Sequence, residues 1–183
     1  MHQEEKMNLD DAQKNMRDAY VGGGPGMLVS GIVWVIAGAV GQFVGVQAAV
    51  LTLFFGGMLI VPVSQQIDKQ LGRAGAHEPG NPLSFLALEG TFLLFIGLFI
   101  AYMVVNIEPS FFFPIMLLII GGRYLTFQTI YGMRLYWIVG GLLAVAGGLC
   151  LSFNAPFAWG GFIGGAIEII GSIVIIRQTM SAE

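Results

Sequence analysis

Residues 157–176 are FAWGGFIGGAIEIIGSIVII, a run of apolar and small residues that contains one charge, Glu168. An α-helix rises about 1.5 Å per residue, so about 20 such residues cross the hydrocarbon core of a bilayer. The run lacks the alternation of apolar and polar residues that is typical of a strand in a membrane barrel. It therefore predicts a membrane-spanning helix.

Five further apolar runs precede this one. The whole chain has 56% hydrophobic and 10% charged residues, whereas a soluble domain has about 25% charged residues. We therefore predict an all-α integral membrane protein, a bundle of six transmembrane helices within residues 25–177. Residues 1–24 then form a cytoplasmic N-terminal segment and residues 178–183 a cytoplasmic C-terminal tail. The five other runs are 27–43, 46–63, 83–105, 110–125 and 135–153.

The N-terminal segment has its own pattern. Leu9, Ala12, Met16 and Ala19 recur at helical spacing behind Asn8, a residue that favours helix N-caps. This pattern predicts a short amphipathic helix at the membrane surface, with a solvated, partly ordered tail as the alternative. The segment has more acidic than basic residues, so we expect no nucleic-acid partner and no polybasic contact with lipid.

The basic residues all lie on one side of the predicted bundle. The connections on the other side contain one acid, Glu108, and no Lys or Arg. Because positive charge is retained on the cytoplasmic side, the chain is predicted to be a multi-pass protein of the bacterial cytoplasmic (inner) membrane, with both termini in the cytoplasm. The eight basic residues are Lys6, Lys14, Arg17, Lys69, Arg73, Arg123, Arg134 and Arg177.

Glycines recur in a way that suggests an internal repeat. The first, third and fifth runs each contain two glycines seven residues apart, and each following helix contains a Gly-Gly pair. One interpretation is three successive parallel helical hairpins; the other is coincidence among 27 glycines. Under both interpretations, the small glycine residues let neighbouring helices approach closely. The spaced glycines are Gly31 and Gly38, Gly90 and Gly97, and Gly140 and Gly147.

Two acids lie inside the apolar runs, Glu89 and Glu168. A charged side chain at the centre of a membrane helix costs on the order of 2.5 to 3.5 kcal/mol, so both are predicted to be buried in the bundle or to face a wet cavity. Gly161, Gly164 and Gly171 share a helix face with Glu168. We predict that these three glycines pack against a neighbouring helix.

Arg123 is the basic residue that could reach either acid. In a structural reading it forms a buried ion pair, and the loss of one partner would cost about 3 to 5 kcal/mol. In a functional reading the two acids exchange protons or bind a cation in a cavity open to the cytoplasm. We favour the structural reading.

Residues 122–137 form the densest polar and aromatic stretch of the membrane part. Tyr and Arg side chains favour the headgroup region, which makes this stretch an interfacial anchor. The alternative is a binding rim for an anionic headgroup or metabolite. The residues of this possible rim are Tyr124, Gln128, Tyr131 and Arg134.

Catalytic chemistry has little support in the sequence. The predicted crossings contain no aspartate and no histidine, so they offer no aspartyl pair and no His base for a nucleophile. No His, Cys or carboxylate cluster has metal-ligand spacing. We expect no enzyme activity, no catalytic residues, no metal and no cofactor. The alternatives for function are a small proton- or ion-coupled transporter or channel of unspecified substrate, and a membrane assembly partner; a homo-oligomer is a further possibility.

Two resemblances rest on particular residues. The Asn154-Ala-Pro156 turn followed by Gly164-Gly-Ala-Ile-Glu168 resembles the two-helix unit of small bacterial acid-resistance (HdeD-like) membrane proteins. That likeness implies a link with acid stress, which suits titratable glutamates, although the first hairpin has no corresponding acid. Residues 121–127, with Tyr131-Gly-Met-Arg134, are similar to a family of uncharacterised bacterial membrane proteins of about this length.

The one-sided basic residues give a direct test of topology. Reporter fusions at Glu183 should be active on the cytoplasmic side, and fusions near Glu108 on the opposite side. An external C-terminus, or a cytoplasmic Glu108, would contradict the predicted orientation.

Overall fold

The computed structural model describes residues 7–181, which are all-helical apart from short turns and loops. Six helices are long and apolar enough to cross a membrane, which confirms the prediction of a six-helix integral membrane bundle. A shorter helix, α1 (Leu9–Ala19), and a 3-10 turn, η1 (Val21–Gly23), precede them, and a second 3-10 turn, η2 (Pro109–Phe111), precedes α5. The six are α2 (Gly24–Phe43), α3 (Val46–Gln70), α4 (Leu83–Val105), α5 (Phe112–Tyr131), α6 (Leu135–Ser152) and α7 (Phe157–Ser181).

Several helices extend past the apolar runs that predict them. The run on α3 ends at Val63, but the helix continues to Gln70 through Ser64 and Asp68. Likewise, the run on α5 ends at Leu125, but that helix continues to Tyr131. Hydropathy detects the part of a helix that faces hydrocarbon, whereas the helical hydrogen bonds continue into the polar zone. The polar ends of these helices were therefore underestimated.

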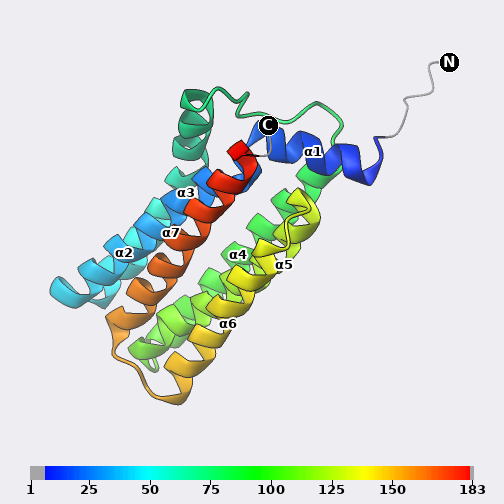
Figure 1. The fold of residues 1–183 in the computed structure, drawn as a ribbon. Helices are drawn as coiled ribbons and strands as arrows, with labels where there is room; N and C mark the ends of the chain where they lie inside the picture. Colours follow the sequence, from blue (N-terminus) through cyan, green and yellow to red (C-terminus); the bar gives the residue numbers. More distant parts are fainter. Residues whose placement is uncertain (1–6, 182–183) are drawn as a thin grey trace.

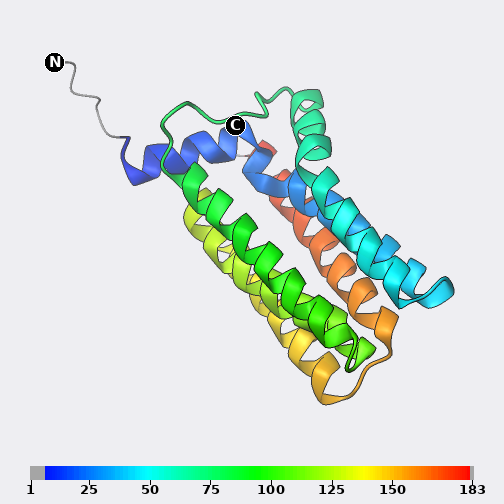
Figure 2. The same cartoon turned by 180° about the vertical axis from the view of Figure 1, so that it is seen from behind.

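The six helices form an open ring in the order α3, α2, α7, α6, α5 and α4 (Figures 1 and 2). Each helix packs on the next in this order, and α5 also packs on α7. The two ends of the ring, α3 and α4, do not form an extended packed pair, and few of their residues are buried. The ring is therefore closed everywhere except between α3 and α4.

The tightest crossing joins α2 and α7. A Cβ added at Gly161 of α7 would lie 2.8 Å from the Gly38 Cα of α2. A Cβ added at Gly31 would lie 2.9 Å from the carbonyl oxygen of Gly165. Real Cβ atoms do not approach backbone atoms so closely, so this crossing requires glycine on both helices.

The three hairpins α2–α3, α4–α5 and α6–α7 each pack internally. The spaced glycines serve contacts both within and between hairpins. Those of α4 face α5 within one hairpin, whereas Gly31 and Gly38 face α7, and Gly140 faces Gly121 of α5. Two contacts between hairpins are therefore closed, α2 with α7 and α6 with α5. The third position, where α4 would meet α3, is the open one.

Helix α1 lies across the end of the bundle that holds both described ends of the chain, which we call the basic end (Figure 1). The Asn8 side chain caps it by accepting a hydrogen bond from the Asp11 amide, as its N-cap pattern predicts. Its apolar residues Ala12 and Met16 are buried against the bundle. The predicted short amphipathic helix is thus present, and its apolar face covers the ends of other helices.

Side chains of α1 also bind the C-terminal end of α5. Arg17 donates to the Tyr131 carbonyl at 2.7 Å, and Gln13 donates to the Thr129 carbonyl at 2.8 Å. The last carbonyls of a helix have no partner within it, so these donors satisfy them. On the other side, Asn81 of the α3–α4 loop donates to the Ala12 carbonyl at 3.0 Å. Helix α1 therefore ties both halves of the open ring together.

The α2–α7 crossing predicts opposite effects for two glycine-to-alanine changes. Gly161→Ala should lower the free energy of unfolding by about 1 to 3 kcal/mol, because its methyl group overpacks against Gly38. Gly141→Ala should be neutral or stabilising by up to about 1 kcal/mol, because its Cβ would meet open space. Thermal melting of both variants in detergent measures the difference. A Gly161→Ala protein as stable as the wild type would contradict backbone contact between α2 and α7.

Candidate functional site

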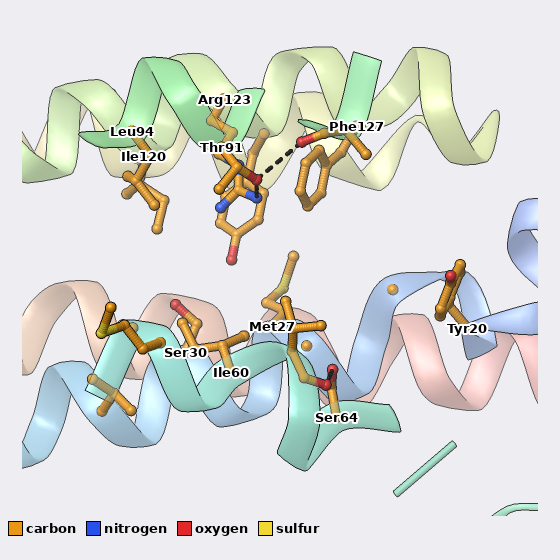
Figure 3. A pocket seen from close by; sticks show the side chains of 18 of the residues that line it. Tyr20, Met27, Ser30, Ile60, Ser64, Thr91, Leu94, Ile120, Arg123 and Phe127 are labelled. Atoms are coloured by element: carbon orange, nitrogen blue, oxygen red, sulfur yellow. Dashed lines mark hydrogen bonds between the residues drawn. The ribbon is translucent and has the colours of Figure 1, made fainter. Parts of the chain in front are cut away.

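A cavity of about 390 Å³ lies inside the open ring, between the α2–α3 wall and the α4–α5 wall. Figure 3 shows the two walls facing each other, with Thr91 and Arg123 on one side and Ser30, Ile60 and Ser64 on the other. Tyr20 and His77 line its basic end, where α1 and the α3–α4 loop lie. The cavity therefore follows the unclosed part of the ring.

Arg123 is the basic residue in the cavity wall. Its Nη2 donates to Thr91 Oγ1 at 3.1 Å, and its guanidinium lies 5.0 Å from the centroid of the Phe127 ring. Its Nε is buried and has no hydrogen-bond partner in the described part of the chain. Eight residues separate Arg123 from the basic end of α5, which places its backbone about 12 Å below that end. A cation at this depth is costly unless a group of the protein or a ligand compensates it.

Glu168 is completely buried, at 0% exposure, just behind the cavity wall. The Tyr124 hydroxyl donates to its Oε1 at 2.9 Å, whereas Oε2 finds no partner within residues 7–181. Ser30 lies close to this carboxyl, and its Oγ also lacks a hydrogen-bond partner among the described residues. Tyr124 and Ser30 line the cavity and Glu168 does not. The acid therefore contacts the cavity only through these two side chains.

The ion pair favoured from the sequence is not formed. No ion pair joins Arg123 to Glu168 or Glu89 in the described part of the chain, although Arg123 and Glu168 lie within electrostatic range. The partner of Glu168 is Tyr124, which stands between the acid and the cavity. Sequence spacing cannot distinguish these partners, because Arg123 and Tyr124 are neighbours in the chain.

Glu89 is exposed, so its predicted burial was wrong. The adjacent Gly90 faces Arg123 on α5, with its added Cβ 3.6 Å from the Arg123 Nε. Successive residues of an α-helix point about 100° apart, so this packing turns Glu89 away from α5. Helix α4 is apolar on all sides, and in its sequence only the spaced glycines Gly90 and Gly97 indicate the face that packs on α5.

The helix-packing glycines Gly161, Gly164 and Gly171 are all buried. Gly161 faces Gly38, and Gly164 faces Leu117 of α5 and Trp34 of α2. Gly171 faces Val139 of α6 and Met27 of α2. One face of α7 thus fits against three helices at once, where the sequence suggested a single neighbour. Side chains at these positions would push α7 away from the centre of the bundle.

The four residues of the predicted rim fall into two groups. Tyr124 and Tyr131 are buried and line the cavity, so the expectation that they anchor the protein at the lipid interface is corrected. Their rings pack with Phe127 and Tyr136, which forms an aromatic cluster inside the bundle. Gln128 is half-buried, Arg134 is exposed, and neither lines the cavity.

Several cavity residues were missed by the sequence analysis. Asp68 was placed outside the crossings but is a buried residue of α3, and its Oδ1 has no hydrogen-bond partner among the described residues. Gly57, Ser64 and Asp68 follow one face of α3, a pattern that becomes visible only if that helix is extended past Val63. His77 also lies outside the predicted crossings, in the α3–α4 loop, and lines the cavity.

Tyr20 and His77 close the basic end of the cavity. The Tyr20 hydroxyl and His77 Nδ1 form a hydrogen bond of 2.8 Å between the end of α1 and the α3–α4 loop. Burial raises the pKa of the Tyr20 phenol, which therefore stays neutral at physiological pH. Within residues 7–181 no three His, Cys, Asp or Glu side chains are grouped as metal ligands. The arrangement thus offers one cation, several hydrogen-bonding groups and apolar walls.

The Tyr124–Glu168 hydrogen bond predicts a specific energetic coupling. Tyr124→Phe leaves a buried carboxylate oxygen without its donor and should lower the free energy of unfolding by about 1 to 3 kcal/mol. In combination with Glu168→Gln, the loss should be smaller than the sum of the two single losses. Denaturation in mixed micelles gives all the required values. Tyr102→Phe, at an exposed position of α4, is the control and should change stability by less than about 0.5 kcal/mol. A stronger coupling of Glu168 to Arg123 than to Tyr124 would contradict this assignment.

Comparison with known proteins identifies a family of unknown function. No curated protein and no solved structure matches the chain. A family model described as a family of unknown function, DUF7010, matches residues 9–178, which include α1 and nearly all of the membrane part. This agrees with the resemblance to an uncharacterised family that residues 121–134 suggest. Because the match covers most of its length, the chain belongs to DUF7010.

Proposed function

We propose that this protein is a non-enzymatic, multi-pass protein of the bacterial inner membrane that binds a small molecule inside its open ring of helices. The observation that carries the proposal is the cavity of about 390 Å³ with Arg123 in its wall. Ligand pockets typically have volumes of about 300 to 1,000 Å³, with mostly apolar walls and a few polar groups. This cavity has the same features.

The distribution of charge supports an orientation for this site. Among the described residues, every Lys and Arg except Arg123 belongs to α1, the loops at the basic end or the helix ends near it. The positive-inside rule therefore favours a cytoplasmic location for the basic end and both termini. In this orientation the polar end of the cavity, with Tyr20 and His77, lies on the cytoplasmic side.

Proton-coupled transport is a second candidate, favoured by the contact between Tyr124 and Glu168. The Tyr124 ring lines the cavity while its hydroxyl binds a buried carboxyl group. A molecule that moves Tyr124 would change the hydrogen bonding of Glu168, and so its affinity for a proton. The resemblance of the hairpins to HdeD-like acid-resistance proteins agrees with such a role.

A variant that fills the cavity tests the proposed binding. Gly57 lines the cavity, and a Cβ added there would meet no atom within 4 Å. Gly57→Phe should therefore fold and occupy the space that a ligand would take. Native mass spectrometry of protein extracted from its own membrane should show a small-molecule adduct on the wild type that is largely lost in Gly57→Phe.

The matched control is Gly141→Phe, because Gly141 also has open space around it but lies outside the cavity. This control should retain the adduct. A wild-type protein without an adduct, or a Gly57→Phe protein that keeps it, would contradict binding in the cavity.

A further inference from the structure

The chemistry of the cavity identifies a class of ligand. We propose that the cavity binds an anionic amphiphile with a single acyl chain, which enters from the bilayer between α3 and α4 and places its carboxylate or phosphate on Arg123. This inference rests on the proposed function and specifies its ligand.

The first argument is the charge of Arg123. Its guanidinium faces the cavity, makes no ion pair with the described acids of the chain, and has a buried Nε without a hydrogen-bond partner. A guanidinium binds carboxylate and phosphate groups through several parallel N–H donors. Thr91 takes one of these donors, which leaves others for an anionic group in the cavity.

The second argument is the order of polar and apolar residues along the cavity. Polar side chains, including those of Tyr20, Ser64, Asp68 and His77, gather toward the basic end. Beyond Arg123, toward the bilayer centre, the wall is apolar. This is the orientation of a lipid in the leaflet at the basic end, with its head near the surface and its chain toward the centre. The apolar residues are Trp34, Leu53, Leu94, Leu98 and Met116.

Asp68 limits how the head group can sit. It lies two residues before the end of α3 at the basic end, whereas Arg123 lies eight residues before the end of α5. A negative head group would be repelled near this buried acid and attracted by Arg123. The two charges together favour a head group at the level of Arg123, with the chain directed away from Asp68.

The third argument is the route of entry. Met58 and Val61 of α3, and Leu88 and Phe95 of α4, line the cavity and are exposed. The gap between the two helices is therefore bordered by apolar side chains that face lipid. An acyl chain can pass between them without leaving hydrocarbon, whereas an ion or a sugar would have to shed its water.

The size of the cavity limits the ligand to one chain. The lining residues of α3 run from Leu53 to Asp68, a rise of about 22 Å. A volume of about 390 Å³ spread over this length makes a narrow channel. It suits one extended chain and leaves no room for the two chains and head group of a phospholipid.

Trp34 provides a reporter inside the cavity. It is 2% exposed and lines the apolar end, whereas Trp137 and Trp159 are more than half exposed. Trp137→Phe and Trp159→Phe leave Trp34 as the single tryptophan, since the chain has three. Bromine quenches tryptophan fluorescence on contact, so quenching of Trp34 reports a brominated chain within the cavity.

The experiment titrates this protein with 9,10-dibromostearate, with the lysophosphatidic acid of the same chain, and with 9,10-dibromostearyl alcohol. We expect saturable quenching by at least one of the two anionic probes, and at least about tenfold weaker binding of the alcohol, because a hydrogen bond to a charged group is lost. Preference for the first or second probe distinguishes a carboxylate from a phosphate head group.

Variants of Arg123 test whether its charge binds the negative head group. Arg123→Gln should weaken binding of the anionic probes by at least about tenfold, and Arg123→Lys should retain part of it. Arg134→Gln, at an exposed position outside the cavity, is the matched control and should bind like the wild type. Gly57→Phe should prevent quenching by all three probes.

Two outcomes would overturn the assignment in different ways. Equal binding of the alcohol and the acids, unaffected by Arg123→Gln, would reject an anionic ligand but leave a cavity that binds small molecules. Absence of quenching by every probe would reject an amphiphile altogether. If the extracted protein also carries no adduct, the proposed binding function fails with it.

Discussion

At the crossing of α2 and α7 the two helices touch through their backbones, with Gly38 against Gly161 and Gly31 against Gly165. Lipid tails are as apolar as leucine, so the hydrophobic effect does not hold membrane helices together, and close van der Waals contact has to do so. This contact joins the first hairpin to the last. Short turns then place α3 on one side and α6 on the other. The α5–α6 contact then positions the middle hairpin.

The same ring explains why a cavity exists at all. Two of the three contacts between hairpins are closed, and the contact between α3 and α4 is replaced by space. Arg123 and Glu168 lie on the two sides of Tyr124, so opposite charges share one region without meeting. The separation keeps the guanidinium available on the cavity side. A direct ion pair with Glu168 would have used the N–H donors of Arg123 that now face the cavity.

Much of the architecture was predictable, because a run of about 20 apolar residues has few alternatives in a bilayer. The buried state of Glu168 also follows from its glycine neighbours on α7. The orientation of Glu89 was harder to predict, since apolar residues surround it and only the small residues Gly90 and Gly97 mark the face of α4 that packs on α5. Asp68 was missed for another reason: the apolar run ends at Val63, whereas the helix α3 continues to Gln70. The cavity depends on which helices fail to meet, and a single sequence does not encode that in any local pattern.

The α2–α7 crossing also has a consequence for the order of biosynthesis. The chain is made from its N-terminus, so α2 is the first membrane helix to emerge and α7 is the last. Gly31 and Gly38 have no permanent partner until α7 has been made. The hydrogen bonds donated by α1 also form late, because Gln13 and its acceptor Thr129 are 116 residues apart. The ring can therefore assemble only after all six helices have been made.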